Sequence, residues 1–502
     1  MGPKQCIPRG VDLDISQFFC YSSILGKKGE GVEGPAERRL LDTQYVRYAL
    51  RLLGNHREFL DDMLANYGRR KELFILKKVM YMPLFLFLDG VKRAIKNEDL
   101  FILYDLFNEP AFRKAIVNLA RSVGEHGVGR PQLFSTPLLA VWNFTNACNL
   151  RCKHCYQNAQ HRLPDELDLH ERLKIVDQLD ANDVAFLAFS GGEPLMDADF
   201  WSVAEYAAKK NIYISLATNG TLISRDVAQR LRDAGVRYVE ISLDSARPEF
   251  HDRLRGISGF WQRTVEGIKN CVEVKDLFVG LAPTITRRNL GELEDMFSLA
   301  KELGVDRFYV FNFIPTGRGK EMYRDDLSPY MREQMLQVLY RHLKSKEMEV
   351  LTTCPQFGRI CLENAPRGLV VTGHYSISEG VTAASDARFV GGCGAGRAYC
   401  AIQPNGEVTP CVFMPITIGD LRSTEFMKIW RESTILRDLR DRKELLNNCG
   451  VCEYRDACGG CRARAYAYYD DIHAADPGCI RNLDKWQELT LRTPVTVVSD
   501  NQ

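Results

Sequence analysis

Three closely spaced cysteines carry the most recognisable chemistry in this sequence. Cys148, Cys152 and Cys155 are separated by three and by two residues, and no fourth cysteine follows nearby. A cubane [4Fe–4S] cluster takes four thiolates, one for each iron. Three ligands from one loop would leave one iron open to a substrate or a cofactor. Buried structural thiols and a zinc site are the alternatives, although zinc ligands usually occur as two separated pairs.

This C-x3-C-x2-C triplet resembles the motif of the radical S-adenosylmethionine (SAM) superfamily. The resemblance implies that the open iron binds the amino and carboxylate groups of SAM. An electron from the cluster would then cleave SAM to a 5′-deoxyadenosyl radical, which abstracts hydrogen from an unactivated C–H bond. Such chemistry belongs to the cofactor, while the protein positions the reactants.

Short motifs after the triplet are similar to the parts of this family that bind SAM. The run from Gly191 to Pro194 resembles the GGEP motif, in which two glycines allow a close approach of the backbone to a ligand. Glu193 and nearby peptide groups would accept hydrogen bonds from the SAM ammonium. Arg255 would pair with the SAM carboxylate, and Arg253 is an equal alternative. Strand-end capping and plain packing are the structural alternatives for the other positions. The SAM contacts that the resemblance implies are Tyr156, Gly191, Gly192, Glu193, Pro194, Asn219, Ser242, Asp244 and Arg255.

A second group of cysteines lies towards the C-terminus. Eight of the sixteen cysteines fall between residues 391 and 480, in a pattern that resembles the SPASM domain of one large radical SAM branch. One departure is the two-residue spacing between Cys458 and Cys461, where the family often has three. Eight thiolates are enough for two fully ligated [4Fe–4S] clusters, and two zinc ions are the alternative. By resemblance, Cys393, Cys400, Cys411 and Cys461 hold one auxiliary cluster, and Cys449, Cys452, Cys458 and Cys479 hold the other.

Fully ligated clusters cannot bind a substrate at iron, so the role expected for the auxiliary clusters is electron transfer. The five remaining cysteines are Cys6, Cys20, Cys271, Cys354 and Cys361. Isolated or buried thiols are the interpretation for all five. Contact with the substrate or with an open cluster position is the alternative for Cys354 and Cys361.

Alternating strand and helix patterns predict a partial (β/α)6 barrel, a TIM-like α/β fold. The expected strands cover 138–144, 184–189, 212–217, 238–243, 278–285 and 307–313, and the expected helices cover 168–179, 197–210, 224–234, 260–274 and 290–303. Strands joined by such crossovers run parallel, with helices outside. The cysteine loop, the GGEP-like turn, Asn219 and Ser242 all lie at strand ends, so they should meet at one mouth of the barrel.

Other segments surround this barrel. The sequence divides into a helical N-terminal region at 1–134, the barrel at 135–345, a bridge at 346–390, the cysteine-rich SPASM domain at 391–485 and a tail at 486–502. Apolar residues at three- and four-residue steps predict helices from about 36 to 125, one of them ended or kinked at Pro83. The apolar run 79–88 is too short to span a bilayer. It is interpreted as the end of a core helix, with contact to a membrane or a greasy substrate as the alternative.

The bulk composition is that of an ordinary globular protein. Hydrophobic residues make up 45% and charged residues 26% of the 502 residues, and the net charge is +1. No long-range field therefore favours nucleic acid or an anionic membrane. The first residues lack the apolar core of a signal peptide, so the expected location is the cytoplasm, where thiols stay reduced and available to metal.

The substrate is the feature that the sequence determines least. The favoured hypothesis is hydrogen abstraction that oxidises or cross-links a protein or peptide, which the N-terminal helices would dock. The second hypothesis is modification of a tetrapyrrole or an isoprenoid lipid, since the loop 315–319 resembles the haem-biosynthesis branch of the family. Both hypotheses need an electron donor such as ferredoxin or flavodoxin. A non-enzymatic iron–sulfur scaffold is the third hypothesis, and no residue is identified as a general base.

Overall fold

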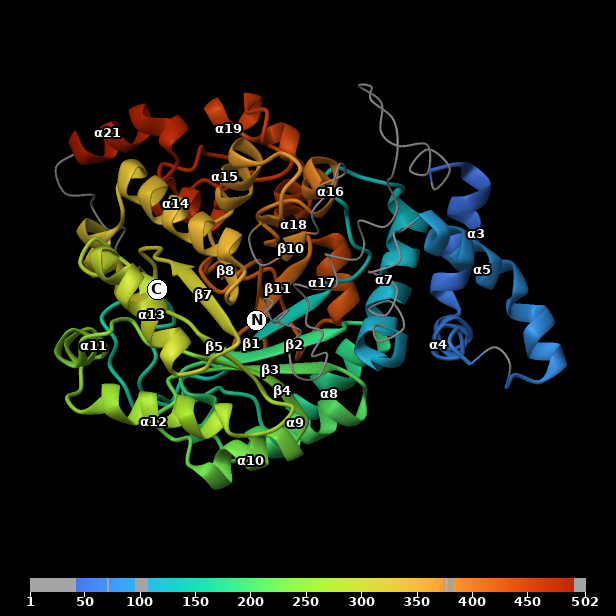
Figure 1. Ribbon diagram of the computed structural model, residues 1–502, viewed down its shortest axis with the longest axis horizontal. Coiled ribbons are helices and arrows are strands. Elements are labelled where there is room, and N and C mark those ends of the chain that lie inside the picture. The colour runs from blue at the N-terminus through green and yellow to red at the C-terminus, as the bar shows by residue number, and fades with distance from the viewer. Residues whose placement is uncertain (1–41, 70–71, 95–106, 373–374, 378–382, 492–502) are drawn as a thin grey trace, which may run out of the picture.

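A sheet of parallel strands with helices along its outer face forms the centre of the molecule (Figure 1). The computed structural model describes residues 42–69, 72–94, 107–372, 375–377 and 383–491. The central strands are β1 (Leu139–Thr145), β2 (Phe186–Gly191), β3 (Tyr213–Thr218), β4 (Val236–Ile241), β5 (Phe278–Leu281) and β7 (Arg307–Asn312). The helices between them include α8 (Leu169–Ala181), α9 (Asp199–Lys209), α10 (Arg225–Asp233), α12 (Phe260–Val272) and α13 (Leu293–Glu302). The predicted partial barrel is confirmed, with element boundaries that move by a few residues.

Local sequence signals explain where several of these elements begin. The strands are runs of mostly buried apolar residues, as expected for parallel strands that are covered on both faces. Asp168 caps α8 by accepting a hydrogen bond from the Glu171 N–H, and the Glu171 carboxylate accepts one from the Asp168 N–H. Ser224 caps α10 because its hydroxyl oxygen accepts a hydrogen bond from the Val227 N–H.

Two elements differ from the sequence expectation. The expected strand over 278–285 is broken into β5 and β6 (Thr284–Ile285), with Pro283 between them. Proline has no N–H to donate to a sheet, so the ladder is interrupted at that point. A helix that the sequence pattern does not predict, α11 (Pro248–Arg255), follows β4. It has a proline in its first turn and ends at Gly256, which has a φ of 84°.

Strands from the C-terminal half extend the sheet at both edges. β8 (Glu349–Thr352) pairs in parallel with β7, and β11 (Tyr399–Ile402) pairs in parallel with β1. β12 (Glu407–Thr409) and β13 (Gly419–Asp420) continue from β11 in antiparallel pairs. The cysteine-rich part of the chain is therefore joined to the barrel by the hydrogen bonds of one sheet.

Further helices follow β7 in the chain, and short 3-10 helices and a small sheet complete this part of the fold (Figure 1). The helices are α14 (Pro329–Ser345), α15 (Phe357–Asn364), α16 (Ala383–Val390), α17 (Phe426–Glu432), α18 (Thr434–Arg440), α19 (Asn447–Val451), α20 (Arg462–Tyr469) and α21 (Leu483–Leu491). β9 (Val370–Thr372) and β10 (Tyr375–Ile377) form a separate antiparallel pair. Short 3-10 helices are η3 (Pro194–Met196), η4 (Leu290–Glu292), η5 (Gly317–Asp325), η6 (Arg442–Glu444) and η7 (Ile480–Asn482).

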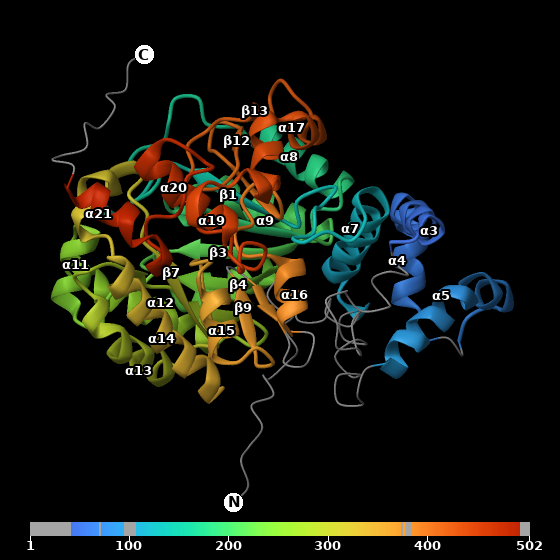
Figure 2. The same ribbon diagram turned by 90° about the horizontal axis from the view of Figure 1, so that it is seen from above.

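N-terminal helices lie to one side of the barrel (Figure 2). They are α3 (Gln44–Asn55), α4 (Arg57–Ala65), α5 (Ile75–Ala94) and α7 (Pro110–His126). Helix α7 lies between the barrel and the other three (Figure 2). The Phe112 ring on α7 packs edge-on against Phe186 of β2, with ring centroids 5.6 Å apart. The Lys114 ammonium lies 2.7 Å from the Asp180 carboxylate, which adds a charged contact at the same junction.

Helix α5 runs from Ile75 to Ala94, so of the two alternatives for Pro83, an end or a kink of the helix, the end is excluded. A proline removes one hydrogen bond of the helix while the flanking turns keep theirs. No helix in the described ranges is long and apolar enough to cross a membrane. Residues 95–106 of the expected helical run lie outside the described residues, as do Cys6 and Cys20.

Candidate active site and cluster cysteines

A cavity of about 260 Å³ lies inside the barrel and reaches the carboxyl ends of its strands. All three cysteines of the triplet line it, together with six of the nine expected SAM contacts. The expected residues in its wall are Cys148, Cys152, Cys155, Tyr156, Gly191, Gly192, Asn219, Ser242 and Arg255. They come from segments that follow four neighbouring strands, as chemistry at the mouth of a parallel barrel requires.

The triplet sulfurs all accept hydrogen bonds. The donors are the Leu150 N–H to Cys148 (3.4 Å), the Ala159 N–H to Cys155 (3.4 Å) and the Arg255 guanidinium to Cys152 (3.7 Å). Burial raises the pKa of Cys148 to about 12 and also raises the pKa of Cys152. Buried thiols of this kind lose their protons when a metal cation compensates the charge. Hydrogen bonds to the sulfurs then stabilise the thiolates, so this loop fits an iron–sulfur cluster.

Arg255 is held in the cavity wall by Asp244. Its Nε lies 2.6 Å from Asp244 Oδ2, and both side chains are buried. Burial alone would raise the pKa of Asp244, but the charge of Arg255 and two neighbouring histidines hold it well below its usual range. Asp244 is not among the residues that line the cavity, and its contact with Arg255 makes it a positioning residue. Arg253, the alternative to Arg255, is also absent from the wall.

Glu193 is not among the residues that line the cavity and lies behind its wall. Its carboxylate is fully buried and accepts hydrogen bonds from the Thr218 hydroxyl at 2.8 Å and the Asn219 N–H at 2.9 Å. Burial raises the pKa of Glu193 to about 7. Glu193 therefore orders the turn after β3, which carries Asn219 into the wall. Pro194 begins η3 and does not line the cavity.

The glycines of the GGEP-like turn are required by the cysteine loop beside them. A Cβ on Gly192 would lie 2.1 Å from the Ala147 carbonyl oxygen. Gly191 has a φ of 114°, which side chains rarely tolerate. The Gly192 N–H donates to the Thr145 carbonyl at 2.7 Å. Glycine thus lets the end of β2 pack at backbone distance against the start of the cysteine loop.

Tyr156 joins the barrel to the cysteine-rich part. Its hydroxyl lies 3.0 Å from Asn143 Oδ1 and 2.9 Å from Ser190 Oγ, at the ends of β1 and β2. Its ring meets Phe413 edge-on, with centroids 4.9 Å apart. The packing alternative therefore describes the contacts of Tyr156, which also forms part of the cavity wall.

The barrel interior supplies wall residues that sequence reasoning missed. These residues alternate along each strand. They are Leu139 and Val141 on β1; Phe186, Ala188 and Ser190 on β2; Tyr213, Ser215 and Ala217 on β3; Tyr238 and Glu240 on β4; and Arg307, Tyr309 and Phe311 on β7. Inward-facing residues of a barrel recur with a period of two. An inward-facing Ser242 therefore predicts that Glu240 and Tyr238 also face inward. Tyr399 and Phe413 come from the cysteine-rich part and gave no such signal.

The second group of cysteines surrounds two smaller cavities of about 30 Å³ each. One is lined by Cys449, Cys452, Cys458 and Cys479, which the sequence grouped together. The other is lined by Cys393, Cys411 and Cys461, while Cys400 lies on β11 outside it. Donors to these sulfurs include the Gly460 N–H to Cys458 (3.3 Å), the Asp476 N–H to Cys449 (3.4 Å), the Arg464 N–H to Cys461 (3.4 Å) and the Tyr399 hydroxyl to Cys411 (3.0 Å). Each of these cavities therefore has cysteine sulfurs that accept hydrogen bonds, as the triplet loop does.

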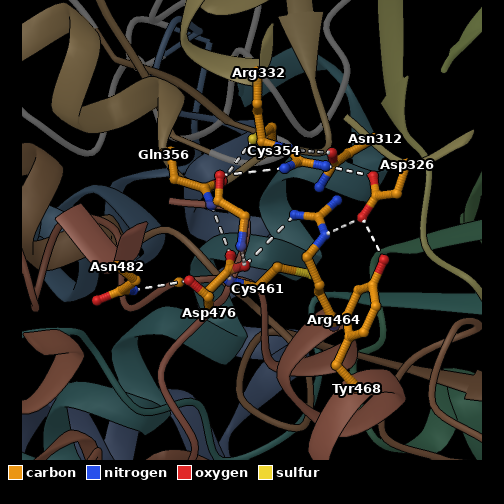
Figure 3. A network of polar contacts seen from close by, with 12 residues as sticks. Asn312, Asp326, Arg332, Cys354, Gln356, Cys461, Arg464, Tyr468, Asp476 and Asn482 are labelled. Carbon is orange, nitrogen blue, oxygen red and sulfur yellow. Dashed lines mark hydrogen bonds and ion pairs between the residues drawn. The ribbon is translucent and has the colours of Figure 1, made fainter. Parts of the chain in front are cut away.

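A buried network of charges joins these cysteines to the barrel (Figure 3). Asp326, which follows η5, accepts a hydrogen bond from Arg332 at 2.5 Å and pairs with Arg464 of α20 at 3.4 Å. On the other side of Arg464, Asp476 accepts a hydrogen bond from the Cys461 N–H at 2.7 Å. All four charged side chains are buried. This network fixes the backbone of Cys461 relative to the strand ends.

The barrel has three cysteines at its mouth, and its sheet continues into a part whose seven cysteines surround two cavities. These features define the class of an iron–sulfur enzyme. The family model described as the radical SAM superfamily matches residues 142–300, and that described as the SPASM iron–sulfur cluster-binding domain matches residues 393–453. The AdoMet-dependent heme synthase of Methanosarcina barkeri is 36% identical over 349 residues, which are 69% of this chain and 97% of the relative. The chain therefore belongs to the radical SAM superfamily and carries a C-terminal SPASM domain.

A second sequence relative and a solved structure are also similar to this chain. The mycofactocin maturase MftC of Mycobacterium tuberculosis is 32% identical over 353 residues, which are 69% of this chain and 83% of the relative. The crystal structure of Streptococcus suis SuiB bound to S-adenosylmethionine matches 80% of this chain and 90% of that chain, with a TM-score of 0.59 and 17% identity. The SuiB match shows a shared fold. The described function of the matched C-terminal family favours iron–sulfur clusters over zinc for the second group of cysteines.

Proposed function

We propose that the protein cleaves SAM reductively in the barrel cavity and abstracts hydrogen from a C–H bond of a tetrapyrrole. The observation that carries the reaction type is the single wall shared by the cysteine triplet, Gly191, Gly192 and Arg255. When bound at the triplet, a [4Fe–4S] cluster supplies the electron and an open iron for SAM. The proposed site therefore combines metal ligands with an arginine of the right charge for the SAM carboxylate.

The chain's own residues bind and orient. Arg255 presents a guanidinium to the cavity and is kept in place by the buried carboxylate of Asp244. Asn219 and Ser242 offer polar groups from the ends of β3 and β4. The barrel interior below them is largely apolar and aromatic, which keeps water away from a reactive radical.

The aromatic lining favours a tetrapyrrole as the substrate. Rings from three strands and from the SPASM part surround the cavity, namely Tyr213, Tyr238, Tyr309, Phe311 and Phe413. Aromatic side chains stack readily on a flat conjugated macrocycle. The relative named as a heme synthase has 36% identity over nearly its whole length, above the 32% of the peptide maturase. Both the lining and the likeness point to the same class of substrate.

Oxidative modification or cross-linking of a peptide is the second candidate. It is supported by the relative named as a mycofactocin maturase and by the helices α3, α4 and α5, which stand away from the barrel (Figure 2). These helices expose large apolar side chains, among them Tyr45, Ile75 and Val79. A substrate chain docked there is the arrangement that this candidate requires.

The reaction is tested by anaerobic reconstitution. Three cubane clusters give about twelve irons per chain, and protein reduced by flavodoxin or ferredoxin is expected to convert SAM to 5′-deoxyadenosine and methionine. Replacing Cys148, Cys152 and Cys155 together by Ala should abolish this cleavage, while Cys449→Ala should leave most of it. A fully reconstituted, reduced protein that forms no 5′-deoxyadenosine would contradict the proposal.

The substrate is tested in the same assay. Porphyrins with carboxylate side chains and synthetic peptides are added separately, and the masses of the products are measured. A rise in 5′-deoxyadenosine together with a changed porphyrin mass supports the tetrapyrrole. Modification of a peptide with every porphyrin unchanged would replace it by the second candidate.

A further inference from the structure

The outer side of the cysteine loop carries exposed basic side chains. Arg151 and Lys153 are exposed, whereas Cys152 between them is buried. The cysteines of the triplet line the barrel cavity, so Arg151 and Lys153 lie on the other side of the same loop, towards solvent. The range 146–164 contains no aspartate or glutamate that could balance them. The loop that carries the metal ligands therefore presents positive charge to solvent.

Helix α11 adds a third basic side chain beside the loop. The Arg151 N–H donates a hydrogen bond to the Arg255 carbonyl at 3.2 Å, and the Lys153 N–H donates one to the Leu254 carbonyl at 2.9 Å. The end of α11 is therefore in backbone contact with the cysteine loop. Arg253 lies in the last turn of α11 and is exposed.

The 3-10 helix η5 adds a fourth basic side chain. The Gly319 N–H donates a hydrogen bond to the Cys155 carbonyl at 3.3 Å, so η5 lies against the last cysteine of the loop. Leu254 of α11 and Met322 of η5 belong to one small apolar cluster, which brings these two segments together. Lys320, next to Gly319, is exposed. The basic surface around the cysteine loop consists of Arg151, Lys153, Arg253 and Lys320.

The charges of this basic surface are not neutralised. Among the described residues, none forms an ion pair with any of its four side chains. By contrast, Arg162, further along the loop, pairs with Glu166 at 3.5 Å and with Asp197 at 3.3 Å. Asp252 and Glu321 are the acidic chain neighbours of the basic surface, and the Asp252 carboxylate already accepts hydrogen bonds from two backbone N–H groups at the start of α12. Four cations thus outnumber the acids beside them.

This concentration of charge is local, because the whole chain has a net charge of only +1. It lies where a reductant has to approach, since the cysteine loop alone separates it from the triplet sulfurs. We propose that the basic surface docks a small acidic electron-transfer protein of the flavodoxin or ferredoxin type. Opposite charges speed such an association and orient the partners.

The docking surface rests on the proposed function and names where its electron enters. One electron leaves the reduced flavin or cluster of the partner and reduces the metal site at the triplet, and no proton is transferred to the chain. Electron-transfer encounters use small interfaces, below about 1,200 Å², so three adjoining segments are enough. Helix α11 lies on the side of the barrel away from α3, α4 and α5 (Figure 1 and Figure 2). A bound donor would therefore leave those helices accessible to a substrate chain.

Binding tests the surface without SAM or turnover. Oxidised flavodoxin and oxidised ferredoxin, each of negative net charge, are titrated separately into the reconstituted full chain in a calorimeter. Arg253→Glu combined with Lys320→Glu changes only residues outside the cysteine loop, and it should weaken binding by about 10- to 100-fold at low salt. Salt at about 1 M, where the Debye length is about 3 Å, should also weaken binding to the unaltered chain.

A matched control has the same change in charge at the other end of the barrel. Lys209 and Lys275 are exposed and come shortly before β3 and β5, whereas the cysteine loop follows the carboxyl end of β1. Lys209→Glu combined with Lys275→Glu should bind the donor nearly as tightly as the unaltered chain does. The proposal is overturned if both double variants bind alike, or if neither donor protein binds. It is equally overturned if an oligonucleotide binds in place of the donors, because the surface would then be a nucleic-acid site.

The route of the electron separates this proposal from the proposed function. Formation of 5′-deoxyadenosine driven by the donor protein should fall in the double variant of Arg253 and Lys320 and not in the control. With photoreduced 5-deazaflavin, a small neutral reductant, all three proteins should cleave SAM at the same rate. A loss with both reductants would show that the two side chains support the cysteine loop instead of docking, and would contradict the proposal. Failure of the proposed function is seen separately, as missing 5′-deoxyadenosine in the unaltered protein with 5-deazaflavin.

Discussion

Gly192 tests the geometry of the cavity mouth with a single methyl group. In Gly192→Ala the new Cβ would lie 2.1 Å from the Ala147 carbonyl oxygen, where real contacts stay above 3.0 Å. The end of β2 and the start of the cysteine loop must therefore separate by about 0.9 Å, the difference between these two distances. Both segments are backbone, held by the hydrogen bond from the Gly192 N–H to the Thr145 carbonyl, so no flexible side chain can absorb the shift.

A displacement of this size at a reacting centre costs about 100-fold in rate. We expect Gly192→Ala to keep its thiol ligands and most of its iron, while 5′-deoxyadenosine formation falls by about that factor. Gly291→Ala is the matched control, because a Cβ there has no atom within 4 Å. The assay is anaerobic SAM cleavage, normalised to iron content. If Gly192→Ala cleaves SAM at the rate of the control, the close packing of the two loops does not set the geometry of the site.

Three further substitutions test charged groups, namely Glu193 behind the cavity wall, Asp326 in the buried network and Arg255 in the cavity wall itself. Burial raises the pKa of Glu193 from its usual 4.5 to about 7, so the unaltered protein should lose stability as the pH rises through that window. Glu193→Gln should remove this loss, as measured by thermal unfolding of the iron-free protein at several pH values. Asp326→Asn takes a carboxylate away from two buried arginines and should lower the free energy of unfolding by about 3–5 kcal/mol. Asp325→Asn, whose partner is exposed, should cost at most about 1 kcal/mol in the same denaturation experiment. Arg255→Lys should raise the KM for SAM by about 10- to 100-fold through the loss of a charged hydrogen bond, whereas Arg253→Lys should leave the KM unchanged.

The six central strands could be predicted because their signals are local. Each is an apolar run, and some of the helices that follow have their own start signals, such as the capping box at Asp168 and the cap at Ser224. Strand β11 has only four residues, and its partner β1 lies far away in the sequence. Nothing in a run of four residues specifies such a partner, so the sequence analysis assigned the cysteine-rich part to a separate domain without its sheet contact.

The site residues divide in the same way. Spacing identified the triplet, because three thiols in one loop need no knowledge of the fold. Spacing also gave the position of Glu193, but its burial under Thr218 depends on how β2 and β3 pack. The case of Cys400 is sharper, since a one-residue change of strand register exchanges the faces of neighbouring side chains. Whether Cys400 or Tyr399 faces the cluster cavity is decided by the pairing of β11 with β1, which local sequence does not contain.

The contact between α3 and α7 gives a way to separate SAM cleavage from substrate docking. A Cβ on Gly54 would lie 2.6 Å from the Arg121 backbone nitrogen, and a Cβ on Gly124 would lie 2.5 Å from the Arg51 backbone nitrogen. The two helices therefore cross in backbone contact, and Gly54→Ala must push them apart at a cost of about 1–3 kcal/mol. Leu52→Ala, half-exposed on the same helix, is the matched control.

No residue of α3 or α7 is among the described residues that line the barrel cavity. Gly54→Ala should therefore leave uncoupled formation of 5′-deoxyadenosine unchanged, while limited proteolysis detects the loosened helices. If these helices dock a substrate chain, turnover of a peptide should fall in Gly54→Ala and not in Leu52→Ala. If the substrate is a porphyrin enclosed by the barrel, its turnover should stay the same in both variants. A fall in uncoupled SAM cleavage would show instead that the helices support the cavity itself, and the separation argued from the structure would be wrong.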